Sequence, residues 1–381
     1  MKNPSQHKIS YSRITALAAS LRSELGGGKL SNKQVCAFLG DDASPEVMQP
    51  TIDIIEDMKL GIDFHYPAVG TDAKSATGSL FPEQSKRAID AADATLFGST
   101  SGNSTAALFY LRWGKQTFAN VRPSQWLPGY ASPMANPQDI DFVIVRENLE
   151  DLYLGLEGDL EDLAALNYYS RHARANLADL GPGKYAIKTI TERGSERVIR
   201  HSFELARQRG QKHKVTVTCK YNMLSTADGL FLDIAKKVAE DYPDIDFEHF
   251  IVDDFLCRMI AHPEDLDVVV TPNLYGDILS DGAAGMIGGL GLAASGCYGE
   301  DYAYFESAHG TAPDIAGQNI INPTATMLSA AMMLDYLDME EAALRLRQAV
   351  RSVYSEGRAL PRDQGGTAST SEFCAAVRAF L

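Results

Sequence analysis

The stretch NLYGDILSD, residues 273–281, follows the β-branched run 268–270 and carries two acids that decide how the rest of the chain is interpreted. Asp277 and Asp281 stand four residues apart, and positions i and i+4 share one face of a helix. If a helix begins at Ser280 and Asp281, both carboxylates can face one cleft, where oxygen ligands suit Mg²⁺ or Mn²⁺. The alternative is that Asp281 only caps that helix.

The composition of the 381-residue chain is that of a globular enzyme, with 45% hydrophobic and 22% charged residues. The net charge of −15 argues against nonspecific binding to nucleic acid or to anionic membranes. No run reaches the roughly 18 apolar residues of a membrane span, and the polar residues 1–10 are no secretory signal. The five cysteines form no CxxC pair, so we expect reduced thiols, a cytoplasmic location and no structural zinc.

Short β-branched or apolar runs alternate with helical patterns, which predicts a layered α/β architecture. Strands are expected at 34–39, 94–97, 141–145, 185–190, 214–219, 250–252 and 267–270. Helices are expected at 45–58, 191–208, 228–241, 255–261, 323–336 and 339–354. No GxGxxG or P-loop follows a strand, and the glycines at 26–28 are expected to be a linker. The acidic stretch 151–179 is either an inserted arm or a plain surface excursion.

Three arginines stand between residues 112 and 146 of the chain. Arg112 ends an apolar helical stretch, Arg122 precedes a proline in an extended segment, and Arg146 follows the strand 142–145. A guanidinium offers a two-pronged donor for a carboxylate. One such arginine is most simply a surface ion pair, but three of them beside metal-binding acids make a polycarboxylate site a competing interpretation.

Two further residues carry proton-transfer chemistry. Lys220 ends a strand, and a lysine there can act as a general acid or base if its neighbours shift its pKa. The phenol of Tyr153 is a suitable proton donor to an enolate carbon. Taken singly, Lys220 is as well explained as a solvated strand end, and Tyr153 as a packing residue.

Several long motifs, in this order, resemble the metal-dependent β-decarboxylating dehydrogenases, the isocitrate/isopropylmalate dehydrogenase family. They are RENLEDLY at 146–153, KYN at 220–222, NLYGDILSD at 273–281, GGLG at 288–291 and FESAHGTAPDIAG at 305–317, with Asn322-Pro323 beyond. The resemblance covers nearly the whole chain. It favours the metal-site interpretation of Asp277 and Asp281 over the helix cap.

The resemblance implies an isopropylmalate-dehydrogenase-like α/β fold of two domains with a central cleft. Residues 1–117 plus 288–381 would form a discontinuous cofactor-side domain. Residues 118–287 would form a central domain for dimerisation and substrate, and residues 151–180 would be its arm if they form one.

The resemblance also implies roles for the residues named above. Arg112, Arg122 and Arg146 would bind the malate carboxylates of the substrate. Asp253, Asp277 and Asp281 would hold Mg²⁺ or Mn²⁺, Lys220 would take the proton of the 2-hydroxyl, and Tyr153 would protonate the enol. Lys220 and Asp253 would reach into the partner subunit's site, which implies a homodimer with shared active sites.

The loop from residue 309 to residue 322 is implied to hold the adenosine half of the cofactor. The residues concerned are His309, Gly310, Thr311, Ala312, Asp314, Ile315 and Asn322. Members that use NADP tend to carry Lys-Tyr after HGTAP, whereas this chain carries Asp314-Ile315. A carboxylate accepts hydrogen bonds from ribose hydroxyls and repels a 2′-phosphate, which predicts NAD. Asp314 as a helix cap is compatible with either cofactor.

The substituent at C3 of the malate decides the substrate. Bacterial-type isocitrate enzymes place Ser and Asn where this chain has Ala106 and Leu108, followed by Phe109. A carboxylate buried against Leu108 and Phe109 would lack partners. We therefore expect NAD-dependent oxidative decarboxylation of a 3-substituted (2R)-malate with an apolar, 3-isopropylmalate-like C3 group.

Several alternatives remain open. They are a tartrate/D-malate-type enzyme, an isocitrate/homoisocitrate-type enzyme, a specialised enzyme with an unusual C3 group and, from another class, a catalytically silent regulatory subunit. Two segments depart from the family pattern and leave the nicotinamide contacts undecided: GDDASPE at 40–46 and GSTSGNST at 98–105.

Overall fold

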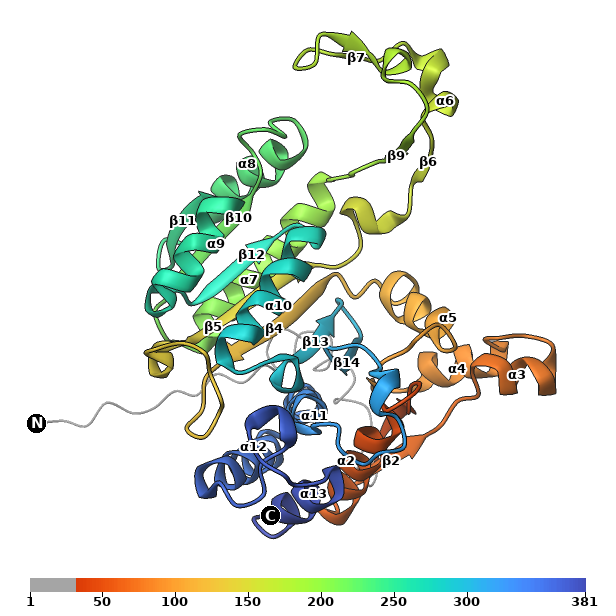
Figure 1. The fold of residues 1–381 in the computed structure, drawn as a ribbon, viewed down its shortest axis with the longest axis vertical. Coiled ribbons are helices and arrows are strands. Elements are labelled where there is room, and N and C mark those ends of the chain that lie inside the picture. The colour runs from red at the N-terminus through yellow and green to blue at the C-terminus, as the bar shows by residue number, and fades with distance from the viewer. Residues whose placement is uncertain (1–31) are drawn as a thin grey trace, which may run out of the picture.

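A computed structural model describes residues 32–381 of the chain (Figure 1). The polar segment 1–10 and the expected glycine linker 26–28 lie outside the described residues. Strands alternate with helices along most of the described chain, which confirms the predicted α/β class. None of the described helices is long and apolar enough to cross a membrane.

A ten-stranded mixed sheet runs through the molecule in the order β11-β10-β12-β5-β4-β13-β14-β3-β1-β2. Its first half contains β11 (Asp246–Ile251), β10 (Lys214–Cys219), β12 (Val268–Thr271), β5 (Asp141–Glu147) and β4 (Ala119–Gln125). Its second half contains β13 (Ala294–Tyr298), β14 (Ala303–Ser307), β3 (Ala94–Phe97), β1 (Lys33–Phe38) and β2 (Ile62–His65). The antiparallel pairing of β4 with β13, where Val121 lies opposite Gly296, joins the two halves.

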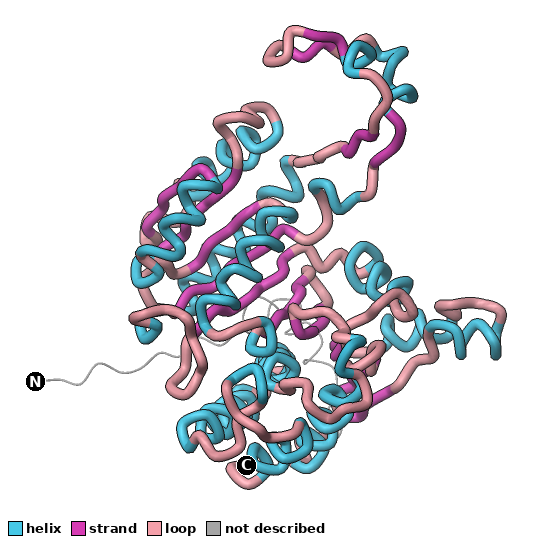
Figure 2. The backbone as a smooth tube through the Cα atoms, in the orientation of Figure 1, coloured by secondary structure: helices cyan, strands magenta, loops and turns pink. Residues whose placement is uncertain are grey.

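Helices pack on the sheet in both halves (Figures 1 and 2). The first half carries α7 (Glu192–Arg209), α8 (Ala227–Ala239), α9 (Val252–Ala261) and α10 (Asn273–Ile287). In the second half α11 (Thr324–Tyr336) packs against β13 and β14, and α4 (Glu83–Ala91) packs against β1. Around them lie α2 (Pro45–Asp57), α12 (Glu340–Glu356) and α13 (Thr370–Arg378), whereas α3 (Gly70–Thr77) stands away from the sheet at the right of Figure 1. Strands β5 and β12 are buried along almost their whole length, as parallel strands between helical layers are.

Residues 155–187 project from the body of the molecule as an arm (Figure 1). Two short antiparallel pairs build it, β6 (Glu157–Asp159) with β9 (Lys184–Ala186) and β7 (Tyr169–Ser170) with β8 (Ala175–Asn176), and α6 (Leu160–Leu163) lies between them. Six large apolar side chains of the arm are exposed: Leu156, Leu166, Tyr168, Tyr169, Leu180 and Ile187. The strand expected at 185–190 is shorter, because β9 ends at Ala186.

Helix α10 begins at Asn273, so the expectation that a helix starts at Ser280 is wrong, and Asp281 is not its cap. Pro272 explains the difference, because a proline cannot donate to a strand ladder and therefore ends β12. The helix starts directly afterwards. Asp277 and Asp281 consequently lie within one continuous helix, one turn apart.

A glycine sets how closely α10 approaches β5. A Cβ atom on Gly276 would lie 2.6 Å from Cβ and Cγ of Arg146, closer than side-chain atoms approach. Only a residue without a side chain therefore allows this spacing. Since Asp277 follows Gly276, the same contact brings the first acid against the strand that carries Arg146.

Candidate active site

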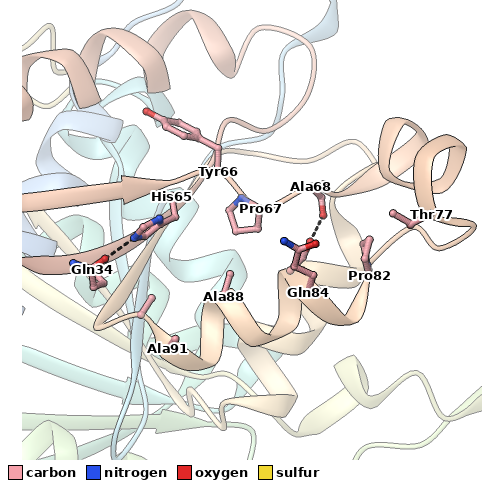
Figure 3. Close-up of a pocket in the computed structure, with 12 residues that line it drawn as sticks. Gln34, His65, Tyr66, Pro67, Ala68, Thr77, Pro82, Gln84, Ala88 and Ala91 are labelled. Atoms are coloured by element: carbon pink, nitrogen blue, oxygen red, sulfur yellow. Dashed lines mark hydrogen bonds between the residues drawn. The ribbon is translucent and has the colours of Figure 1, made fainter.

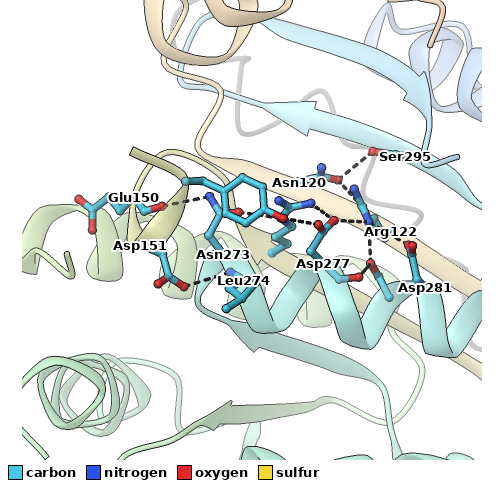
Figure 4. A network of polar contacts seen from close by, with 12 residues as sticks. Asn120, Arg122, Glu150, Asp151, Asn273, Leu274, Asp277, Asp281 and Ser295 are labelled. Carbon is cyan, nitrogen blue, oxygen red and sulfur yellow. Dashed lines mark hydrogen bonds and ion pairs between the residues drawn. The ribbon is translucent and has the colours of Figure 1, made fainter. Parts of the chain in front are cut away.

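Two strands and a helix bring oppositely charged side chains together (Figure 4). Arg122 lies on β4 and Arg146 on β5, in strands that pair with each other. One terminal nitrogen of Arg122 lies 3.3 Å from Asp277 Oδ1 and 3.5 Å from Asp281 Oδ1. The same nitrogen donates to the Ser280 hydroxyl at 2.7 Å. Both carboxylates of α10 therefore converge on one guanidinium.

Arg146 completes this cluster from the neighbouring strand. Its Nε donates to Asn273 Oδ1 at 2.9 Å, and a terminal nitrogen donates to Asp277 Oδ1. The Tyr153 hydroxyl donates to the other oxygen of Asp277, and the Tyr153 ring centre lies 4.7 Å from the Arg146 guanidinium. Three of the predicted site residues, Arg122, Arg146 and Tyr153, thus meet on the side chain of a fourth, Asp277.

Buried polar contacts hold Tyr153 in place. It lies in a short 3-10 turn, Asp151–Leu154, directly before the arm. The Asp151 carboxylate is fully buried and accepts the backbone N–H groups of Leu152 at 2.8 Å and Leu274 at 3.0 Å. It also pairs with the ammonium of Lys188 at 3.4 Å. The start of α10 is therefore tied to the turn that positions the phenol.

The pKa values of the ionisable groups in this cluster shift in different directions. Burial would raise the pKa of Asp277, but Arg146 and Tyr153 outweigh it and the pKa is lowered. Burial raises the pKa of Asp281, and Arg122 only partly opposes this. Burial and Arg122 lower the pKa of Arg146 to about 10, so Arg146 stays charged at neutral pH. Burial and the bond to Asp277 raise the pKa of Tyr153, which keeps the phenol protonated.

Arg112 stands beside this cluster on a π-helical turn, Tyr110–Gly114, that continues α5 (Thr105–Phe109). Burial opposes its charge, but Tyr304, Glu306 and Cys297 raise its pKa. Its Nε is buried and has no hydrogen-bond partner among the described residues. Leu108 is half-buried, whereas Phe109 is 51% exposed.

Lys220 and Asp253 lie together, but apart from the acids of α10. The Lys220 ammonium bonds Asp253 Oδ1 and lowers the pKa of that carboxyl. Over residues 32–381 no group of three His, Cys, Asp or Glu side chains gathers where it could hold a metal. Asp253 therefore does not join Asp277 and Asp281 within one chain.

A cavity of about 500 Å³ lies along the predicted cofactor loop. Of the predicted cofactor residues, those lining it are His309, Gly310, Ala312, Ile315 and Asn322. Thr311 is buried and its carbonyl accepts the backbone N–H of Ala43 at 3.1 Å, whereas Asp314 is exposed. Burial lowers the pKa of His309, and its Nε2 has no partner among the described residues.

Several residues of the arginine cluster and of the cofactor-loop cavity were not predicted from the sequence. Asn273 and Ser280 bond the two arginines, and both stand in the quoted stretch 273–281, where only the acids were singled out. Arg362 and Asp363 line the cofactor-loop cavity from a distant part of the chain. Asp363 accepts from Asn322 Nδ2 at 3.0 Å. No local motif announces these two residues.

The two departing loops are bound to each other and to the cofactor loop. Asp41 Oδ2 accepts from the Thr100 hydroxyl at 2.7 Å, the Ser101 N–H at 2.9 Å and the Asn103 N–H at 3.2 Å. The Ser99 hydroxyl donates to the His309 carbonyl at 2.8 Å. The segments 40–46 and 98–105, which both depart from the family pattern, are therefore held together by hydrogen bonds between them.

A larger cavity, of about 620 Å³, lies away from this chemistry (Figure 3). Its lining comes from β1, β2, α4 and the connections around them, including Gln34, His65, Pro67 and Ala88. None of the predicted site residues lines it. Its volume alone therefore gives no reason to place the reaction there.

Comparison with known proteins agrees with the fold. Residues 34–377 match the family model for isocitrate/isopropylmalate dehydrogenase. The chain belongs to this family of oxidatively decarboxylating dehydrogenases.

Individual relatives have different substrates in their names. A 3-isopropylmalate/3-methylmalate dehydrogenase of Methanocaldococcus jannaschii is 40% identical, over 90% of this chain and 97% of that protein. An isocitrate/homoisocitrate dehydrogenase of Thermus thermophilus is 39% identical over the same shares. The crystal structure of isocitrate dehydrogenase from Methylococcus capsulatus has a TM-score of 0.80 and 34% identity, covering 91% of this chain and 99% of that one.

Proposed function

We propose that this protein catalyses the NAD-dependent oxidative decarboxylation of a 3-substituted (2R)-malate with an apolar C3 group. The observation that carries the proposal is the meeting of Arg122 and Arg146 with Asp277 and Asp281. Guanidinium groups bind carboxylates, and paired carboxylates bind a hard divalent cation. One cluster therefore offers guanidinium N–H groups to an anionic substrate and carboxylate oxygens to the metal that would activate it.

The donor chemistry fits Mg²⁺ or Mn²⁺, with Asp253 of the partner subunit as the third acid. When bound, the cation would polarise the oxygen at C2 and the nicotinamide would accept the C2 hydride. Arg112, Arg122 and Arg146 would hold the substrate carboxylates and fix its orientation. The Asp277 carboxylate, which here accepts from Arg146 and Tyr153, would be one of the ligands that hold this cation.

The proton transfers fall to two residues. The partner subunit's Lys220 would remove the proton of the 2-hydroxyl while hydride leaves C2, which yields the 2-oxo acid. The C3 carboxylate then leaves as CO₂, and its bonding electrons remain in the enolate. Tyr153 would protonate C3, and its raised pKa keeps the required proton on the phenol at neutral pH.

Exposed apolar side chains support a homodimer with shared sites. On α9 the buried face carries Phe255 and Met259, and Asp253 lies on the other face with exposed Leu256 and Ile260. Ile278, next to Asp277 on α10, is 59% exposed. Exposed apolar patches mark protein interfaces. We place this interface in the central domain, residues 118–287, with residues 1–117 plus 288–381 as the cofactor-side domain.

The cofactor preference and the compartment rest on separate features. The exposed Asp314 stands beside Ile315, which lines the cofactor-loop cavity, and its carboxylate favours the ribose hydroxyls of NAD over a 2′-phosphate. All five cysteines are free thiols, which agrees with a reducing, cytoplasmic location.

The test is NAD⁺ reduction by the purified protein with Mg²⁺ or Mn²⁺. The substrates compared are 3-isopropylmalate, isocitrate, homoisocitrate, D-malate and tartrate, with NADP⁺ in parallel. Turnover of 3-isopropylmalate is the expected result. Preferred turnover of isocitrate or homoisocitrate, the second candidate given the Thermus relative, would show that a partner for the extra carboxylate exists. No turnover of any 3-substituted malate would favour a silent subunit.

A further inference from the structure

An exposed aromatic pair stands on the helix that carries Arg112. Phe109 ends α5 with half of its side chain in solvent, although phenylalanine is usually buried. The ring centres of Phe109 and Trp113 lie 5.0 Å apart with their planes at 81°, an edge-on pair. Trp113 and Arg112 share a π-helical turn, a distortion that recurs at functional sites.

The aromatic pair is continuous with the arginine cluster. The Arg112 guanidinium lies 5.7 Å from the centre of the Trp113 ring. After burial and Arg122, the charge of Arg112 is a further cause of the lowered pKa of Arg146. An anion held by Arg112 would therefore lie near Trp113, the ring against which Phe109 packs.

A hydrogen bond holds one ring of the pair, and the other ring lies beside a small, exposed residue. The Trp113 indole N–H donates to the Leu149 carbonyl at 3.0 Å, and Leu149 is buried. On the preceding turn Ala106 is exposed and carries only a methyl group. The Trp113 indole is therefore held in place, and Ala106 leaves space beside the Phe109 ring.

We propose that Phe109 and Trp113 bind an aromatic substituent at C3, so that the substrate class is the 3-benzyl-type malates. This inference rests on the proposed function and narrows it. A benzyl group covers more of the exposed ring than an isopropyl group, and aromatic pairs attract beyond the area that they bury. A molecule with carboxylates at one end and an aryl group at the other uses both the arginines and the rings.

The experiment compares kcat/KM for racemic 3-benzylmalate and 3-isopropylmalate with NAD⁺ and Mg²⁺ in the wild type and two variants. Phe109→Leu removes the exposed ring but keeps an apolar side chain. Phe380→Leu is the matched control, because Phe380 is 43% exposed near the end of the chain. We expect the wild type to prefer 3-benzylmalate. We expect Phe109→Leu to lose about tenfold with 3-benzylmalate and less than about threefold with 3-isopropylmalate, and the control to lose neither.

The failures are distinguishable. If the wild type prefers 3-isopropylmalate, or if Phe109→Leu lowers both substrates equally, this inference is overturned and the proposed function stands. If no 3-substituted malate is oxidised, the proposed function falls and the inference falls with it.

Trp113 has a second contact that a separate variant isolates. Trp113→Phe keeps an aromatic ring beside Phe109 but loses the N–H bond to Leu149, which precedes Tyr153 in the chain. We expect kcat to fall with both substrates while their KM ratio stays unchanged. A changed KM ratio with unchanged kcat would overturn this positioning role of the indole N–H and leave only the ring contact.

Discussion

The two groups of charged residues in this molecule are built differently. In the arginine cluster the Arg146 side chain is 3% exposed and meets Asp277 on a neighbouring helix. In the second group the Asp253 side chain is 70% exposed and pairs with Lys220. The first group is complete within one chain, and the second faces outward beside the apolar residues of α9. Under the proposed function, a single subunit would supply the arginines, Tyr153 and two metal-binding acids to one site, and the exposed Lys220 and Asp253 to the site of its partner.

The largest expected effect separates catalysis from stability. Lys220→Ala and Asp277→Asn should each lower kcat/KM by at least about 10³-fold, since under the proposed function one removes the base and the other a metal ligand. Lys220→Ala should leave the free energy of unfolding nearly unchanged, because exposed pairs contribute about 0–1 kcal/mol. Asp277→Asn should lower it by about 3 kcal/mol, because two buried arginines lose a charged partner. Enzyme assays and urea unfolding measure both quantities.

Equal loss of stability in the two variants would contradict the difference between the buried and the exposed group. Lys212→Ala is a suitable control for Lys220→Ala, because Lys212 donates to the carbonyl of Leu266 and stands outside both groups. We expect this control to keep full activity.

The second expected effect is complementation between inactive subunits. A purified heterodimer of Lys220→Ala and Asp281→Asn subunits should recover about half the activity of the wild-type dimer, since one of its two symmetric sites is intact. A heterodimer of Lys220→Ala and Asp253→Ala subunits is the matched control and should stay inactive, because both lesions fall on the donated half. Recovery in neither heterodimer would mean that each site belongs to one chain.

The third expected effect is a pH dependence of stability that arises from a buried carboxyl group next to the arginine cluster. Burial raises the pKa of Glu147, next to Arg146, from 4.5 to about 7. The folded protein therefore binds more protons than the unfolded chain between these values, and stability falls as pH rises through them. The loss reaches roughly 3 kcal/mol at pH 7.5 relative to pH 4.5. Between pH 4.5 and pH 7.5 the free energy of unfolding of Glu147→Gln should fall by roughly 3 kcal/mol less than that of the wild type. Urea unfolding at a series of pH values measures this, and an equal fall in the two proteins would contradict the raised pKa of Glu147.

The smallest expected effect concerns the cofactor. Replacing Asp314 by Lys together with Ile315 by Tyr should shift preference from NAD⁺ towards NADP⁺ by about tenfold, or about 1.4 kcal/mol. The ratio of kcat/KM for the two cofactors measures this. The cofactor loop contributes no side chain to either charged group, so we expect the KM of the acid substrate to stay unchanged. An unchanged cofactor ratio would remove this loop as the determinant.

Parts of the fold follow from the sequence because local signals agree with the tertiary structure. The β-branched run 214–219 and the apolar run 94–97 are strands with the predicted bounds. Strands β13 and β14, with the sequences ASGCY and AYFES, were not predicted. The small residues of β13 have weak strand propensity, and pairing inside the sheet stabilises them instead. Tyr304 and Phe305 of β14 do favour a strand, a local signal that the sequence-based prediction did not use.

The site was predictable in its members but less so in its arrangement. The motifs singled out Arg122, Arg146, Tyr153, Asp277 and Asp281, and the structure brings these five together. The convergence depends on Gly276 and on the start of α10 after Pro272, which no motif indicates. Lys220 and Asp253 remain assigned by resemblance, because the partners that we propose for them belong to another chain.

The joint between β4 and β13 has a mechanical consequence. Three residue pairs span it, between 119–121 and 296–298, whereas β4 pairs with β5 over seven. No flexible tether separates the two halves at this point, because they share one hydrogen-bonded sheet. Any rotation of one half against the other must therefore twist these three residue pairs. Their hydrogen bonds resist the twist and favour one angle between the two halves.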